Sequence, residues 1–225
     1  MSRYPLLSLF ITGCMYPTLA PHIGEGTTVL KPKQVGVTVT GGGGGGRYTI
    51  GNVNTTSLGG GAEARVRVGL SGNQELGGSV VAGIGSKVTG EPPVGAGVAV
   101  SYKIAPLSWL ALVADVGAID RVISSTAIFG GSLGVIVAPY TASGGTQLYT
   151  GAKGSVSIPI LQGASGSAFL VAVPIGLDWH ATSRFRTFVE GGFLLGHGEV
   201  VAGGTTTATD GYGGYGAVGV GYAFR

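Results

Sequence analysis

The stretch G-Y-G-G-Y-G-A-V-G-V-G-Y-A-F, residues 211–224, decides the fold of this chain. A β-strand sends alternate side chains to opposite faces. One face of this segment then carries Val218, Val220, Tyr222 and Phe224, and the other carries alanine and glycine. A soluble sandwich shows polar groups on its outside, whereas a membrane barrel turns its large apolar face to lipid and its small face to the lumen. The segment therefore favours a membrane barrel.

The composition limits the remaining fold classes. The 225 residues fit one all-β domain, and 46 glycines argue against long helices. Only 10% of the residues are charged and 44% are hydrophobic, which excludes a disordered polyelectrolyte. The sequence has no run of about 18 apolar residues, so it predicts no membrane-spanning helix, and strands must make any membrane contact. The net charge of +3 comes from scattered basic residues, which does not indicate nucleic-acid binding.

The alternation of the last segment recurs along the chain. Most of the predicted strands reach the roughly 9–11 residues that a tilted strand needs to cross a bilayer. Their connections are alternately short and long, as in outer-membrane barrels, with the long ones expected at residues 41–60 and 197–210. We predict an all-β, transmembrane, antiparallel up-and-down barrel over residues 34–225, with about ten strands and with eight or twelve left open. The predicted strands are residues 34–40, 62–70, 74–85, 94–105, 109–118, 127–138, 147–158, 167–179, 184–195 and 211–224.

The N-terminus has the layout of a secretion signal. Arg3 precedes a short apolar stretch, and Ile11-Thr12-Gly13-Cys14 resembles the lipobox of bacterial lipoproteins. The resemblance implies that residues 1–13 are a signal peptide and that Cys14 carries a covalent acyl lipid, the sole prosthetic group expected. Residues 14–33 hold three prolines without periodicity, which predicts a lipid-anchored tether.

The C-terminus resembles the assembly signal of bacterial outer-membrane barrels, through Gly219, Tyr222 and Phe224. This resemblance implies a bacterial outer-membrane location, with membrane lipids and the barrel assembly machinery as partners. An even strand count places both barrel termini in the periplasm and the lipid anchor in the inner leaflet. Aromatic residues beside the short turns predict a girdle at the headgroup boundary: Tyr102, Trp109, Trp179, Phe185, Tyr222 and Phe224.

If the large apolar side chains face lipid, the charged residues face the lumen. Arginine at mid-bilayer costs about 2–4 kcal/mol, so an outward position is unfavourable. Six basic and five acidic residues nearly balance, which predicts internal ion pairs and argues against a strongly ion-selective pore. The predicted lumen charge network comprises Glu63, Arg65, Arg67, Glu75, Lys103, Asp115, Lys153, Asp178, Arg184, Arg186 and Glu190.

The sequence offers little support for an enzyme. Asp178-Trp179-His180 has the Asp-x-His spacing of the omptin proteases, but it lies beside a predicted short turn and lacks a second acidic pair. His197-Gly198-Glu199 has no neighbouring nucleophile. With three histidines and one cysteine, a dedicated metal site is not expected either.

The leading functional hypothesis is a non-enzymatic lipoprotein barrel that serves as a structural or accessory component of an envelope protein assembly, with other envelope proteins as partners. Two alternatives stay open. One is a small-solute, porin-like channel through the glycine-lined interior. The other is a surface adhesin that uses the glycine- and threonine-rich segments 41–60 and 197–210.

Overall fold

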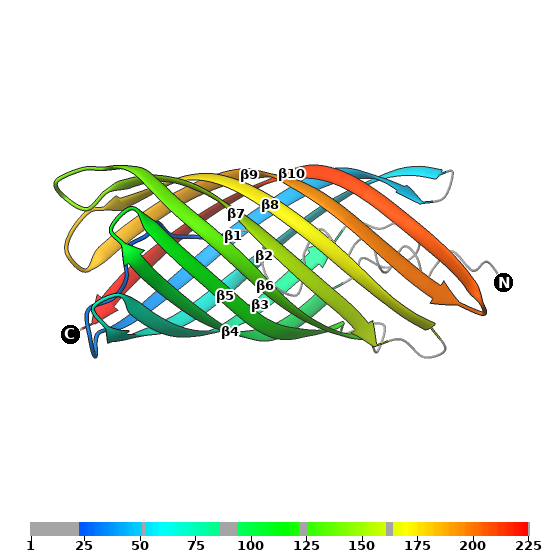
Figure 1. Ribbon diagram of the computed structural model, residues 1–225, viewed down its shortest axis with the longest axis horizontal. Coiled ribbons are helices and arrows are strands. Elements are labelled where there is room, and N and C mark those ends of the chain that lie inside the picture. The colour runs from blue at the N-terminus through cyan, green and yellow to red at the C-terminus, as the bar shows by residue number, and fades with distance from the viewer. Residues whose placement is uncertain (1–22, 51–52, 86–93, 122–125, 161–163, 225) are drawn as a thin grey trace.

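The computed structural model describes residues 23–50, 53–85, 94–121, 126–160 and 164–224. Ten antiparallel strands form one closed barrel, in which β10 pairs with β1 (Figure 1). The prediction of a ten-stranded antiparallel barrel is therefore confirmed. The strands are β1 (Val35–Ile50), β2 (Val53–Ser71), β3 (Gln74–Gly85), β4 (Val94–Leu107), β5 (Leu110–Arg121), β6 (Thr126–Thr141), β7 (Gln147–Ile160), β8 (Ala164–His180), β9 (Phe185–Ala202) and β10 (Thr205–Phe224). Within the described ranges, no helix is long and apolar enough to cross a membrane.

The two faces of the wall differ as the alternation of β10 predicts. Val218 and Val220 are about half exposed on the outside, whereas Ala217 is buried on the inside. The same inversion holds around the barrel, with Leu133 and Phe193 among the most exposed side chains. A barrel that is apolar outside and polar inside suits a lipid surrounding.

The two ends of the barrel differ in their connections. Short turns join β2 to β3, β4 to β5, β6 to β7 and β8 to β9, and Val35 and Phe224 lie at the same end. We call this the terminal end and the opposite one the loop end. All six aromatic residues of the predicted girdle are exposed in strands or turns close to the terminal end: Tyr102, Trp109, Trp179, Phe185, Tyr222 and Phe224.

The two segments predicted as long loops are mostly strand, so that prediction was wrong. Residues 41–46 belong to β1 and pair with β10 on one side and with β2 on the other. Residues 197–210 form the paired ends of β9 and β10, joined at Gly203 and Gly204, whose φ angles are 56° and 76°. Glycine lacks the side-chain alternation that marks a strand in sequence, but its backbone groups still pair fully with two neighbours.

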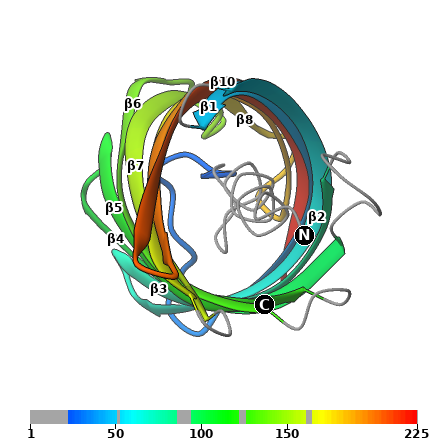
Figure 2. The same ribbon diagram turned by 90° about the vertical axis from the view of Figure 1, so that its right-hand side faces the viewer.

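The described segment that precedes β1, residues 23–34, lies against the inner wall of the barrel and at its mouth. Residues 23–34, which we call the plug, enter at the terminal end and run along the inner wall (Figure 2). A tight turn connects the plug to β1, with a 2.9 Å hydrogen bond from the Gln34 amide to the Lys31 carbonyl and a φ of 65° at Lys33. Gly69 of β2 receives this turn through two backbone hydrogen bonds. The described part of the expected tether is thus wall-bound rather than free.

Candidate functional site: a plugged lumen

Glu25 of the plug is the centre of a buried ionic cluster. Its carboxylate pairs with Arg67 of β2 and, at 2.7 Å, with Arg186 of β9. Lys103 of β4 lies at 3.7 Å and Arg65 of β2 at 3.8 Å. Four cations from three strands therefore face one carboxylate that the wall itself does not provide.

The wall residues around Glu25 also pair with one another. Arg67 bonds Glu75 of β3 at 3.0 Å, and Arg186 bonds Asp178 of β8 at 3.3 Å. Arg65 bonds Glu63 at 3.0 Å within β2. These second partners hold the guanidinium groups in place, so the Glu25 site is preorganised by its surroundings.

A second carboxylate binds the backbone of the plug. Glu190 of β9 accepts hydrogen bonds from the Ile23 amide at 3.1 Å and from the Gly24 amide at 3.0 Å. The hydroxyls of Tyr149 and Tyr215 donate to the same carboxylate at 2.8 and 2.7 Å. Glu190 is 2% exposed, so neutral donors from the plug and from two other strands satisfy the oxygens of a deeply buried carboxyl group.

Other wall groups bind the backbone further along the plug. The Lys103 ammonium donates to the carbonyls of Gly26 and Thr28, each at 2.8 Å. Asp178 accepts from the Gly26 amide at 3.1 Å, and Gln147 of β7 accepts from the Thr27 amide at 2.8 Å. The wall thus supplies partners for successive peptide groups, in the manner of a peptide-binding groove.

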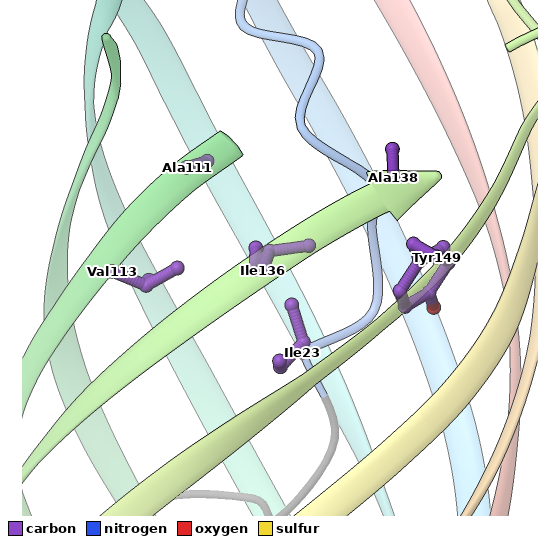
Figure 3. Close-up of a cluster of buried hydrophobic side chains, with 6 residues drawn as sticks. All are labelled: Ile23, Ala111, Val113, Ile136, Ala138 and Tyr149. Carbon is purple, nitrogen blue, oxygen red and sulfur yellow. The ribbon is translucent and has the colours of Figure 1, made fainter. Parts of the chain in front are cut away.

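Ile23 provides an apolar contact at the inner end of the plug. It packs with Ala111 and Val113 of β5, Ile136 and Ala138 of β6, and Tyr149 of β7 (Figure 3). This inner wall is apolar, unlike the charged wall around Glu25. Ile23 is 5% exposed, and burying such a side chain contributes about 1.5–3 kcal/mol.

Glycine occupies the two positions beside Glu25 for different structural reasons. Gly24 has a φ of 72°, a conformation that costs side-chain-bearing residues roughly 1–2 kcal/mol. Gly26 has an ordinary φ but no room, because an added Cβ would collide with Oε1 of Gln147. The sequence Gly24-Glu25-Gly26 therefore fits this part of the lumen on both sides of the carboxylate.

Little space remains around Glu25. A cavity of about 10 Å³ lies between the plug and the wall residues Thr38, Thr40, Glu63 and Arg65. This is close to the minimum volume that one water molecule needs. The described plug and wall therefore leave room for about one water molecule beside Glu25.

The charge of Glu25 is strongly stabilised in this position. Burial alone would raise the pKa of its carboxyl group, but Arg67, then Lys103 and Arg186, hold that pKa well below its ordinary value of 4.5. Glu25 therefore keeps its negative charge at neutral and mildly acidic pH while the plug is seated.

Most residues of the predicted lumen network line the interior. Asp115 of β5 forms a separate pair with Lys153 of β7 at 3.1 Å and accepts a 2.8 Å hydrogen bond from Ser132. Arg65 is partly buried, and Arg184 lies half-buried in the β8–β9 turn rather than inside the wall. The other nine are buried: Glu63, Arg67, Glu75, Lys103, Asp115, Lys153, Asp178, Arg186 and Glu190.

The two histidine pairs lie at opposite ends of the barrel. His180 Nε2 is 3.5 Å from Asp178 Oδ1 at the terminal end, where Asp178 also binds the plug. His197 lies in β9 rather than in a loop, 2.7 Å from Asp210 and 3.5 Å from Glu199, on the exposed outer face near the loop end. Among the described residues, no group of three or more His, Cys, Asp or Glu side chains could hold a metal ion.

The residues of the predicted assembly signal divide between the two faces. Tyr222 and Phe224 are exposed outside, with ring centroids 4.9 Å apart. Gly219 faces inward, where an added Cβ would collide with the buried ring of Phe188. Cys14 and the predicted signal peptide lie outside the described residues.

Sequence reasoning missed the plug and the wall groups that bind it. The prediction considered charged residues, and it therefore did not include the neutral side chains of Tyr149, Tyr215 and Gln147. One signal was available: the predicted lumen set has one basic residue in excess, and the lone carboxylate of Gly24-Glu25-Gly26 precedes the first strand.

Comparisons with known proteins find weak structural similarity to several bacterial proteins and little sequence similarity. No family model matches the chain, and no curated protein matches its sequence. The structure is similar to the outer membrane protease OmpT from Escherichia coli, at 11% identity and a TM-score of 0.43 over 88% of this chain and 100% of that one. It is similar to the translocator domain of the autotransporter NalP from Neisseria meningitidis, at 14% identity and a TM-score of 0.45 over 98% and 96%. It is also similar to the β domain of the Bordetella autotransporter BrkA, at 12% identity and a TM-score of 0.49 over 83% and 98%. At these values no activity is transferred from these proteins to this chain.

Proposed function

We propose that this protein is a non-enzymatic barrel of the bacterial outer membrane that acts as a small-solute channel, closed at its periplasmic end by its own plug. The single observation that carries the proposal is the seating of Glu25 among Arg67, Arg186 and Lys103. This contact holds inside the lumen a segment that belongs to no strand. Such a segment has the freedom to leave without unpairing the wall.

The inner wall beyond the plug supports a solute path. Towards the loop end, the inward positions of β1 are Gly42, Gly44, Gly46 and the buried Tyr48, and those of β9 are glycine and aliphatic residues. The inward positions of β10 are Gly213 and Gly211, followed by three threonines. A ten-stranded barrel is slightly wider than the eight-stranded size that side chains fill. Small inward residues leave that extra width to water, whereas the charged wall lies where the plug sits.

Planar-bilayer recording tests the channel. The wild-type protein should be mostly closed, and the full-length double variant E25Q/G26A should show discrete conductance steps, because it removes the central charge and displaces Gly26 from Gln147. The matched control is Lys31→Gln, which alters an exposed cation of the plug. A silent double variant, with insertion and barrel folding verified, would refute the channel.

A lipid-anchored accessory role is the second candidate, and one observation favours it. The mouth at the terminal end has a cavity of about 140 Å³, lined by Lys31, His180 and Arg184 but by no described carboxylate residue. A basic mouth in the periplasm fits an acidic partner protein. Purification in mild detergent should retain a partner that the K31E/R184E variant loses, and a partner-free wild type would count against this role.

The adhesin alternative loses its structural motive. The segments 41–60 and 197–210, which prompted it as loops, are mostly barrel wall.

A further inference from the structure

The groups that hold the plug belong to the barrel wall and form a binding site in their own right. They come from β2, β4, β7, β8, β9 and β10, and several are fixed by wall partners that do not involve the plug. We call this set the cradle: Arg67, Lys103, Gln147, Tyr149, Asp178, Arg186, Glu190 and Tyr215.

Some contacts of the cradle recognise backbone groups, which every extended peptide carries. Glu190, Asp178 and Gln147 bind backbone amides, and Lys103 binds two backbone carbonyls. These contacts set the direction of the chain without selecting side chains.

Three positions of the bound segment do select for side chains. The position of Ile23 lies against an apolar wall, and that of Glu25 faces Arg67 and Arg186. At the position of Gly26, an added Cβ would collide with Oε1 of Gln147 and push that side chain away from the Thr27 amide. Two further positions matter as well, because Gly24 has a φ of 72° and the Thr27 hydroxyl donates to the Ser108 carbonyl and accepts from Gln147 Nε2. The five positions define the pattern apolar–Gly–acid–Gly–Thr, which is Ile23-Gly24-Glu25-Gly26-Thr27 in this chain.

We propose that the cradle binds extended peptide segments of this pattern in trans, supplied by another polypeptide that enters the periplasmic mouth once the plug has left. The proposal rests on the proposed function only in that the plug leaves its seat. Such a segment carries one carboxylate between two glycines, and the basic mouth attracts it before it reaches Arg67 and Arg186. The plug, being tethered, competes with it at an effective concentration of about millimolar.

Fluorescence anisotropy on the folded, full-length E25Q/G26A variant in detergent tests the proposal. The probe is the synthetic peptide Ile-Gly-Glu-Gly-Thr-Thr with a fluorophore at its C-terminus, the end that points to the mouth. We expect saturable binding, at least tenfold weaker binding of the peptide with Gln in place of Glu, and the same loss when Ala replaces its second Gly. Wild-type protein, whose cradle is filled, should bind the probe at least tenfold more weakly than the variant.

Further measurements separate this proposal from the channel and from misfolding. Hydrogen exchange at residues 23–34 shows whether the plug has left, and the single variant Gly26→Ala replaces the double variant if the latter does not fold. Equal binding of the Glu and Gln peptides, or no binding to a barrel whose plug has left, overturns the cradle. A variant that conducts without binding peptide refutes the cradle alone, and one that binds peptide without conducting supports the cradle and refutes the channel.

Discussion

Replacing Glu25 with Gln should release the plug while leaving the barrel wall intact. The substitution keeps the shape of the side chain but removes the negative charge that faces Arg67, Arg186 and Lys103. Breaking a buried ion pair by removing one partner costs about 3–5 kcal/mol. The lower end applies here, because Arg67 keeps Glu75 and Arg186 keeps Asp178 as partners. Lys103 likewise keeps two carbonyls while the plug is seated.

A loss of about 3 kcal/mol shifts the equilibrium between the seated and the released plug by a factor on the order of 100. Single-channel recording measures this as the ratio of open to closed time, which should rise by that factor in E25Q. Hydrogen exchange of the Ile23 and Gly24 amides, bound to Glu190 in the seated plug, should accelerate in parallel. The exposed Lys31→Gln control should change neither measurement. Wild-type open time together with wild-type exchange in E25Q would refute the reasoning that the charge of Glu25 holds the plug.

The other predictions concern neighbouring groups, acidity and the N-terminus. Gly26→Ala should weaken plug seating by about 1–3 kcal/mol through its collision with Gln147, seen as faster exchange over residues 23–34, whereas an unchanged exchange rate would contradict that steric account. Tyr149→Phe should destabilise the folded barrel by about 1.5–3 kcal/mol, since the wall carboxylate of Glu190 loses a donor from β7, and an unchanged thermal unfolding midpoint would count against this role. Because the pKa of Glu25 is lowered in the seated plug, its contribution is complete above its ordinary pKa of 4.5 and declines as pH falls below that value. Open time should therefore rise with acidification below pH 4.5 in the wild type and respond less in E25Q, which lacks this titrating group; identical profiles would refute the assignment. Cys14→Ala should abolish labelling by a fatty-acid analogue, and labelling that persists would exclude a lipid on Cys14.

The strand pattern could be predicted because the relevant signal is local. In β8 the alternation from Phe169 to Trp179 specifies which face each side chain takes, whatever the strand pairs with. The same rule fails for residues 41–46, where glycine presents no side chain to alternate. Those residues are strand because β10 and β2 supply hydrogen-bond partners on both sides, and that information is distant in sequence.

The plug could not be predicted for a related reason. Its contacts join residues far apart in sequence, such as the amide of Gly24 and the carboxylate of Glu190, which are 166 positions apart. Most of them involve backbone groups, which every residue carries and which leave no mark on composition. The prolines that indicated a free tether are compatible with the structure, since Pro32 occupies the turn before β1.

The near-balance of the lumen charges acquires a more specific meaning from the plug. Around Glu25 the described wall provides four cations, Arg65, Arg67, Lys103 and Arg186, and three carboxylates at ion-pair distance from them: Glu63, Glu75 and Asp178. Glu190 does not fill the difference, because neutral donors from Tyr149, Tyr215 and the plug backbone surround it. Glu25 supplies the fourth negative charge, and the carboxylate paired with Lys103 among the described residues is that of Glu25. The wall alone is therefore an incomplete ionic cluster. In a narrow interior, a carboxylate that lies between small residues can complete such a cluster with little steric conflict. Gly24-Glu25-Gly26 has this composition.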